Sequence, residues 1–284
     1  MPVSLQLIAL LTNGGLAFLK FTVGMQAGSR ALIADAFNSA GDVIATFVAW
    51  IAFRYGLKPP DKDHPYGHQN AETLAGLLIG AMLCATGIFI GIDSVLGLEG
   101  EHPESPPGAM AIWAALFTGA VKTVLYGVSI RAGRASNSPT LLASARDHAA
   151  DVFSSMVALL GIYLARHGYP IFDSLAGVLI GLYIVYLSMD PLRSNIAILM
   201  QQTAPELASR ASAIAAKIEG VETVFRVRVQ PLGGTYRMDM DIHVSPELRV
   251  GDAHEIAHDV EDRVREQMDH VFEVHVHIEP AAQN

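Results

Sequence analysis

Cysteine is almost absent from this sequence: Cys84 is the only one among 284 residues. A single cysteine forms no disulfide within the chain, and it cannot supply the thiolate clusters that hold structural zinc. Any metal bound by this chain must therefore be held by oxygen and imidazole ligands.

Charged residues are also scarce, at 17% of the chain, whereas 51% of the residues are hydrophobic and the mean hydropathy is +0.34. These values are not typical of a soluble domain. Basic residues are fewer than acidic ones, since 19 Lys and Arg stand against 28 Asp and Glu, and the formal net charge is −9. This acidic balance argues against a nucleic-acid partner.

The hydrophobic residues are concentrated in six long apolar runs. Each run comes close to the roughly 20 residues that a helix needs to cross a bilayer. The sequence therefore predicts an α-helical polytopic membrane protein with six transmembrane helices, near residues 3–25, 31–55, 74–98, 110–130, 141–164 and 171–189.

The chain changes character at residue 201, where a polar segment begins that carries most of the acidic residues. Its pattern predicts a helix, two strands, a second helix and a last strand, at residues 205–220, 221–232, 235–244, 250–268 and 272–280. This αββαβ order indicates a small α+β domain with helices on one face of its sheet. We therefore expect a membrane domain at residues 1–200 and a soluble domain at 201–284.

Basic residues beside the spans predict the orientation in the membrane. They concentrate in the loops after the second, fourth and sixth spans, whereas the segment EGEHPESPPG holds none. By the positive-inside rule, the basic loops lie in the cytoplasm. Both termini and the soluble domain are thus expected in the cytoplasm, with the spans in the cell (inner) membrane. The residues that carry this argument are Arg54, Lys58, Lys62, Arg131, Arg134 and Arg193.

The segment ARDHAAD places Asp147 and Asp151 one helical turn apart in the fifth span, and Asn38 and Asp42 have the same spacing in the second. A carboxylate in hydrocarbon costs at least roughly 2.5–3.5 kcal/mol, so it normally faces water or a cation. Counted from opposite helix ends, Asp42 lies ~17 Å and Asp151 ~15 Å into the membrane. The four side chains are therefore expected to meet near the midplane and to bind one divalent cation through oxygen, which suits Mn²⁺.

These acidic residues also permit a structural interpretation. Lys20 and Lys122 are available within the spans, so an interhelical cluster of salt bridges is the alternative to a cation site. Asp35, Asp93 and Asp173 lie close to the outer helix ends, where capping or a hydrated vestibule is expected.

The segment PPDKDHPYGHQNAE, between the second and third spans, contains the candidate metal ligands Asp61, His64 and His68. The two histidines have the spacing of a zinc-protease helix, but Pro65 and Gly67 break a helix and no Glu follows His64. An EF-hand also fails, because Pro65 stands where a ligand belongs. A metal site and a solvated turn capped by Asp both remain open.

Histidines gather toward the C-terminal end. His275 and His277 share one face of a predicted strand, and His254 and His258 share one face of a predicted helix. Such a density predicts a metal site in the soluble domain. The candidates are His243, His254, His258, His275, His277 and Glu279, whereas His102, His167 and His270 are expected to be ordinary exposed residues.

Four elements, in order along essentially the whole chain, resemble the cation diffusion facilitator family of divalent-metal efflux transporters: ADAFNSAGDV, DKDHPYGHQNAE, ARDHAADVFSSM and the αββαβ tail with strand-borne His. The resemblance implies a proton-coupled antiporter rather than an enzyme, with no catalytic cofactor. It also implies a homodimer whose cytoplasmic domains pair and bind regulatory metal. By position it assigns a transport site to Asn38, Asp42, Asp147 and Asp151, a loop site to Asp61, His64 and His68, and a cytoplasmic site to His243, His254, His277 and Glu279.

Four positions distinguish this chain within the family. Zinc-exporting members usually carry His where this chain has Asp147 and Asp where it has Asn38. The all-oxygen site resembles the manganese or iron branch, so Mn²⁺ is the expected substrate, with Fe²⁺ and Zn²⁺ as alternatives. Asn70 replaces a Lys that many members carry, which argues against a loop-to-tail ion pair, and Phe225 replaces a His of some relatives.

Proton coupling has a physical basis as well. An emptied transport site would leave three carboxylates close together in a low-dielectric cavity. Because like charges and desolvation both favour protonation there, proton uptake is expected to accompany metal release.

Two other classes of function fit parts of the sequence. A membrane-embedded metalloenzyme needs a water-activating metal beside a general base, and the spans contain neither an HExxH motif nor a glycine-flanked catalytic Asp. A metal sensor without transport could use the tail alone, but it does not need carboxylates within the membrane.

Overall fold

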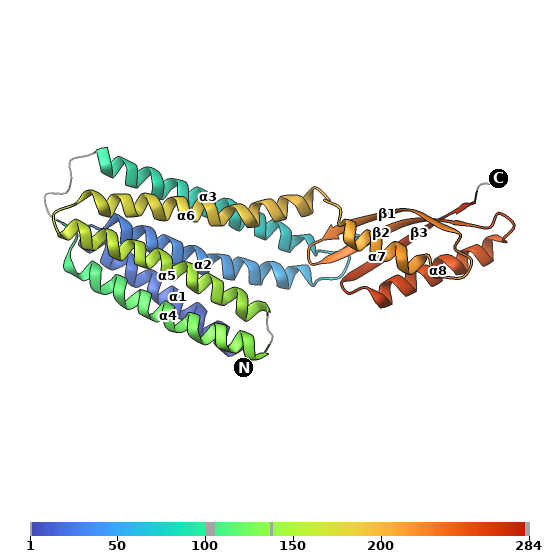
Figure 1. Cartoon of the computed structure of the whole chain (residues 1–284), viewed down its shortest axis with the longest axis horizontal. Helices are drawn as coiled ribbons and strands as arrows, with labels where there is room; N and C mark the ends of the chain where they lie inside the picture. Colours follow the sequence, from blue (N-terminus) through green and yellow to red (C-terminus); the bar gives the residue numbers. More distant parts are fainter. Residues whose placement is uncertain (1, 100–105, 137–138, 282–284) are drawn as a thin grey trace. The chain divides into compact units, whose positions relative to one another are not determined.

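The computed structural model of the chain describes residues 2–99, 106–136 and 139–281. The chain divides into two compact units (Figure 1). The first comprises Met1–Trp50 and Leu78–Leu192, and the second comprises Ile51–Leu77 and Arg193–Asn284. The loop after the second long helix therefore belongs to the same unit as the C-terminal sheet.

Six long helices form the N-terminal part of the chain, each of 26 to 30 residues. A helix of this length exceeds the ~30 Å thickness of the hydrocarbon core. Five of them, α2 to α6, are long and apolar enough to cross a membrane, judged by length and composition. The six are α1 (Pro2–Ala27), α2 (Arg30–Gly56), α3 (Asn70–Glu99), α4 (Ala109–Ser136), α5 (Pro139–Arg166) and α6 (Ile171–Leu199).

Small residues let these helices pack closely. The buried core of the first unit is rich in alanine, with Ala31, Ala115 and Ala158 almost fully inaccessible. Helices α3 and α6 run side by side (Figure 1), and a Cβ at Gly87 would lie 2.8 Å from the Gly181 carbonyl oxygen. Glycine is thus required at this crossing, because its lack of a side chain lets the two helices approach closely.

The C-terminal part of the second unit has the predicted αββαβ order. Its sheet has the order β1-β2-β3, with β1 and β2 antiparallel and β2 and β3 parallel. The parallel pair is possible because α8 connects β2 to β3 as a crossover. The elements are α7 (Pro205–Ala215), β1 (Thr223–Leu232), β2 (Thr235–Val244), α8 (Val250–Gln267) and β3 (Val271–Pro280).

The two faces of this sheet differ in chemistry. Met238, Met240 and Ile242 of β2 are completely buried in a core shared with α7 and α8. The alternate residues point to the opposite face. That face carries charged and imidazole side chains, among them Asp239, Asp241 and His243. Both helices cover the apolar face of the sheet, as predicted. The opposite, polar face carries ion pairs such as Arg226–Asp241.

The helix α7 is shorter than predicted, because it ends at Ala215 rather than near Gly220. After Ala215 the chain tightens: the backbone N–H of Ile218 donates to the Ala215 carbonyl at 3.1 Å, three residues back. Gly220 has a φ of +90° and turns the chain into β1. The glycine therefore terminates this segment, but a tight turn lies between it and the helix.

Candidate metal transport site

Polar side chains of α2 and α5 meet inside the first unit. The Asn38 Nδ2 donates to Asp151 Oδ1 at 2.9 Å. Asn38, Asp42, Asp147 and Asp151 all line one cavity of about 750 Å³, together with residues of α3 and α6. The structure thus brings together the four side chains of the predicted transport site.

The four residues differ in how far they are exposed to solvent. Asp151 and Asn38 are buried, Asp42 is half-buried and Asp147 is exposed. Asp42 interacts electrostatically with Asp151 and Asp147, which places the three carboxylates within reach of one another. Their oxygens are not all within 4.8 Å of each other, so closing them around one ion requires side-chain movement. The accessible Asp147 has the freedom to make that movement.

A lysine forms an ion pair with one of the carboxylates that line the cavity. The Lys122 ammonium, from α4, forms an ion pair with Asp151 Oδ2, and both side chains are buried. Because Asn38 donates to the other oxygen of Asp151, a cation that binds this carboxylate competes with Lys122 for its negative charge. The sequence offered an interhelical salt bridge as the alternative to a cation site. Such a salt bridge is therefore present, at the Asp151 side of the cavity.

A second buried ion pair lies outside the cavity lining. The Lys20 Nζ is 2.7 Å from Asp35 Oδ2, with both side chains fully inaccessible. Lys20 also donates to Ser39 at 3.1 Å, and Ser154 and Ser155 donate to Asp35. The expectation that Asp35 caps a helix or faces a vestibule is wrong, because Lys20 of α1 reaches across and pairs with it.

The remaining outer acids behave as expected. Asp173 accepts hydrogen bonds from the Ser29 hydroxyl at 2.6 Å and from the Arg30 backbone N–H at 2.7 Å. It therefore supports the N-terminus of α2, where Ser29 is the cap. Asp93 is 59% exposed and lies 3.6 Å from the Arg30 guanidinium.

Several cavity residues escaped the sequence reasoning. Tyr183 and Asp190 of α6 and Arg146 of α5 also line the cavity. His148 is not among the lining residues but is buried beside them, and neither of its ring nitrogens has a hydrogen-bond partner within the described part of the chain. The one signal for His148 was its place beside Asp147 in ARDHAAD. Nothing in the pattern of α6 indicated that it contributes.

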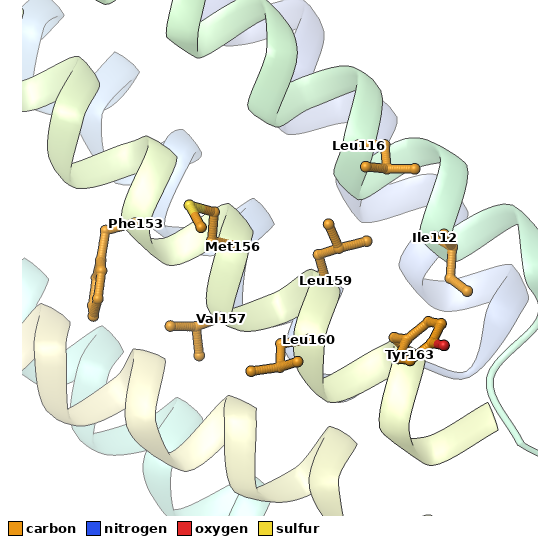
Figure 2. Close-up of a pocket in the computed structure, with 8 residues that line it drawn as sticks. All are labelled: Ile112, Leu116, Phe153, Met156, Val157, Leu159, Leu160 and Tyr163. Carbon is orange, nitrogen blue, oxygen red and sulfur yellow. The ribbon is translucent and has the colours of Figure 1, made fainter. Parts of the chain in front are cut away.

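A second hollow, of about 720 Å³, differs in chemistry. Figure 2 shows that α4 and α5 supply its lining, which consists of aliphatic and aromatic side chains and one thioether. Phe153, Met156 and Leu160 in this lining are more than half exposed. An apolar surface of this kind suits contact with lipid, and it offers no carboxylate or amide oxygen to a hard cation.

The loop between α2 and α3 brings its three predicted ligands together. Asp61 Oδ1 lies 3.3 Å from His64 Nδ1, and Asp61 Oδ2 lies 3.3 Å from His68 Nε2. Within residues 2–99, 106–136 and 139–281, this is the only group of three His, Cys, Asp or Glu whose ligand atoms all lie within 4.8 Å of one another.

The loop is built to hold Asp61 as a carboxylate. The backbone N–H of His64 donates to Asp61 Oδ1 at 2.7 Å, and that of Asp63 donates at 3.0 Å. The His64 hydrogen bond is the main reason why the pKa of Asp61 is lowered from its ordinary value. His68 is buried under the edge of the Tyr55 ring, at 5.0 Å between centroids.

The same loop contacts the sheet of its unit. The Arg237 guanidinium of β2 lies over the Tyr66 ring, 5.1 Å from its centroid, and Arg237 Nε is 3.2 Å from Glu273 on β3. The loop therefore contacts the sheet through a cation–π interaction, without a lysine at position 70.

On the polar face of the sheet, three of the four predicted cytoplasmic ligands lie together. His243 Nε2 is 3.8 Å from Glu279 Oε2, and His277 Nε2 is 3.6 Å from Glu279 Oε1. Phe225 stacks on the His243 ring at 4.8 Å and so occupies the side where some relatives carry a histidine. The fourth residue, His254, lies on α8 at the other face of the sheet, where it pairs with His258.

These features define a multi-pass membrane protein with a carboxylate-lined cavity and a separate α+β domain. Residues 6–200, which cover α2 to α6 and all but the first turn of α1, match the cation efflux transmembrane domain, and residues 204–281 match the cation efflux protein cytoplasmic domain. The chain belongs to the cation efflux family. As expected, it is a transporter of divalent metal and not an enzyme.

Relatives match along nearly the full length. The manganese efflux system protein MneP of Bacillus subtilis is 31% identical, over 96% of this chain and 94% of that protein. The magnetosome protein MamB of Paramagnetospirillum magneticum is 27% identical, over 92% and 88%. A solved MamM-CTD structure is 30% identical over 27% of this chain and 96% of that one, with a TM-score of 0.26.

Because the Lys20–Asp35 ion pair is buried, we expect its disruption to lower the free energy of unfolding. Replacing Lys20 with Met leaves the Asp35 carboxylate buried without its counter-ion, and we expect a loss of about 3–5 kcal/mol of stability. The double variant Lys20→Met/Asp35→Asn removes the charge as well and should recover most of the loss. Thermal unfolding of the full-length protein in detergent measures both effects.

The exposed Lys217 supplies the control, because Lys217→Met removes only a solvated charge and should leave the unfolding temperature unchanged. A Lys20→Met variant as stable as the wild type would show that the ion pair contributes nothing to the packing of α1, α2 and α5.

Proposed function

We propose that this protein exports divalent transition metal ions, Mn²⁺ foremost, from the cytoplasm in exchange for protons. It works as a homodimer in the cell membrane, with both termini and the soluble domain in the cytoplasm. The observation that carries the proposal is the single cavity lined by Asn38, Asp42, Asp147 and Asp151. The name of the manganese efflux relative agrees with it.

The chemistry of the cavity supports a hard cation. Its four candidate ligands offer only oxygen, from three carboxylates and the carbamoyl group of Asn38. Mn²⁺ accepts six oxygen ligands, including water, whereas Zn²⁺ favours four-coordinate sites with His or Cys. A cavity of about 750 Å³ leaves room for the waters that complete an octahedron.

Formal charge supports a divalent ion. Asp190 and Arg146 in the lining offset one another, and Lys122 offsets one of the three remaining carboxylates. The site thus carries two net negative charges, which one divalent cation neutralises. A neutral complex is the favoured state in a low-dielectric environment.

The same balance supports proton coupling. When the metal leaves, two net negative charges stay in a cavity bounded by apolar helices, and protons are the ions available to neutralise them. An exchange of one metal ion for protons keeps the charge of the site small throughout the cycle. An acidic outer compartment therefore drives export.

The two metal-ligand clusters outside the helices fit a regulatory role. The loop site of Asp61, His64 and His68 has its ligand atoms already together, and the sheet site of His243, His277 and Glu279 has its atoms within 4 Å of a shared carboxylate. Metal at either place stabilises the arrangement that completes its ligands. We propose that this metal binding favours pairing of the two cytoplasmic domains of the dimer.

Metal flux in proteoliposomes tests the transport site. Asp42→Asn keeps the shape of the side chain but removes one of the charges that bind the ion, so Mn²⁺ flux should fall to background. Asp93→Asn is the matched control, because Asp93 is a membrane-helix aspartate outside the cavity lining, and its flux should stay normal.

The same vesicles test the coupling. Imposing an acidic pH on the side that receives the metal should accelerate Mn²⁺ flux, and abolishing the gradient should slow it. Normal flux from Asp42→Asn would remove this cavity as the transport site. Flux indifferent to the gradient would replace antiport by facilitated diffusion.

Lys122 should compete with the metal ion for the Asp151 carboxylate. Lys122→Met removes the cation that occupies Asp151, so Mn²⁺ should bind more tightly while turnover slows because release is harder. The variant should unfold at a lower temperature without metal, since Asp151 loses its counter-ion, and Mn²⁺ should raise that temperature by more than in wild type. An equal or smaller rise would contradict the competition.

Selectivity should depend on Asp147. Its carboxylate completes an all-oxygen site, whereas Asp147→His introduces the borderline nitrogen ligand that Zn²⁺ prefers. We expect the wild type to favour Mn²⁺ in a competition flux assay and the variant to shift toward Zn²⁺. An unchanged Mn²⁺/Zn²⁺ ratio would mean that backbone geometry, and not this ligand, sets the preference.

A further inference from the structure

Two histidines on α8 face each other in a way that neither the transport cavity nor the sheet cluster explains. His254 and His258 are one helical turn apart and exposed, and their Nε2 atoms are 3.1 Å from one another. Their ring centroids are 4.3 Å apart with the planes at 66°. Two imidazole nitrogens at this distance share either a proton or a metal ion.

A carboxylate fixes one of the two rings. Glu261 Oε2 is 3.0 Å from His258 Nδ1, which leaves His258 Nε2 directed at His254. Glu261 is itself held, because its Oε1 accepts a hydrogen bond from the Val276 backbone N–H of β3 at 3.3 Å. A carboxylate that binds the far nitrogen of an imidazole is the usual partner of a metal-ligating histidine, where it sets the tautomer and the ring orientation.

The separation of the two Nε2 atoms fits one shared ion. Ligands at about 2.0–2.1 Å from a tetrahedral metal lie roughly 3.3 Å apart, close to the 3.1 Å observed here. The helix around the pair is acidic, with six Asp and Glu against two Arg between Val250 and Gln267. That charge raises the local concentration of cations.

We propose that His254 and His258 form a metal site on α8, oriented by Glu261, for an imidazole-preferring divalent ion such as Zn²⁺, Ni²⁺ or Cu²⁺. Water completes the coordination. Because nitrogen ligands rank Mn²⁺ lowest among these ions, the site discriminates against Mn²⁺. It is independent of the transport cavity and stays valid if the cargo is another metal.

The proposed site is connected to the sheet of its own domain through Glu261. Glu261 joins His258 to the backbone of Val276, which lies between His275 and His277 on β3. Metal that holds His258 and Glu261 in place therefore also holds this strand, beside the sheet ligands His277 and Glu279.

Copper titration of the full-length protein in detergent, followed by electron paramagnetic resonance, tests the proposal. Cu²⁺ is the probe because it binds imidazole strongly and its spectrum reports coordinated nitrogen. His258→Asn and His254→Asn should each remove one equivalent of bound Cu²⁺ with a two-nitrogen signature. Glu261→Gln should keep the ligands but weaken binding at least tenfold.

His270→Asn is the matched control: His270 is an exposed histidine of the same domain, and its φ of 64° suits asparagine. It should leave the stoichiometry unchanged. Excess Zn²⁺ should displace the α8 copper, whereas the same excess of Mn²⁺ should not.

Two results would overturn the proposal. If neither histidine variant loses a copper equivalent, the pair is an N–H···N hydrogen bond and not a site. If Mn²⁺ competes as well as Zn²⁺, the site does not have the stated preference for nitrogen-seeking ions. Because the readout is binding to a domain outside the helices, neither result depends on the outcome of the flux experiments.

Discussion

A carboxylate stays within the apolar part of a membrane protein only where a cation or several donors balance its charge. Two such balances connect the long helices of this protein. Lys20, Ser154 and Ser155 bind the Asp35 carboxylate, which joins α1, α2 and α5. Lys122 and Asn38 hold the two oxygens of Asp151, which joins α2, α4 and α5. The alanine-rich core between them adds close packing but little directional constraint, so these charges specify which helix faces meet.

The two ion pairs have the same chemistry but different access. The Lys20–Asp35 pair is fully inaccessible and closed by hydroxyl groups, so no room remains for an added ligand. The Lys122–Asp151 pair borders a cavity that also presents Asp42 and Asp147. An ion entering the cavity has other carboxylates to bind while it competes with Lys122, whereas an ion near Asp35 has none. The access of ions from the cavity therefore distinguishes the two pairs. Lys20–Asp35 is a structural salt bridge, whereas Lys122–Asp151 is placed so that a metal ion can compete for its carboxylate.

The sequence predicted what depends on spacing along one helix or strand. The i,i+4 pairs of α2 and α5, the alternation of β2 and the order αββαβ follow directly from local periodicity, and the family motifs added the connection between α2 and α5. Lys20 and Lys122 were visible as possible partners, but which carboxylate each one binds depends on packing between helices far apart in sequence. The contribution of α6 to the cavity and the separation of His254 from the sheet histidines depend on tertiary structure in the same way.

Ligand chemistry is unequally distributed over the chain, and that distribution has a consequence for regulation. Oxygen ligands line the cavity among the helices, whereas the clusters with imidazole lie in the other unit, in the loop, on the polar face of the sheet and on α8. On ligand chemistry alone, an ion that suits imidazole would therefore favour these clusters over the cavity, and a hard ion would do the reverse. If metal regulates the protein as we propose, the regulating metal need not be the metal that is carried. Since Glu261 and Val276 connect the α8 pair to the strand that bears His277, the two imidazole clusters would respond to one such ion together.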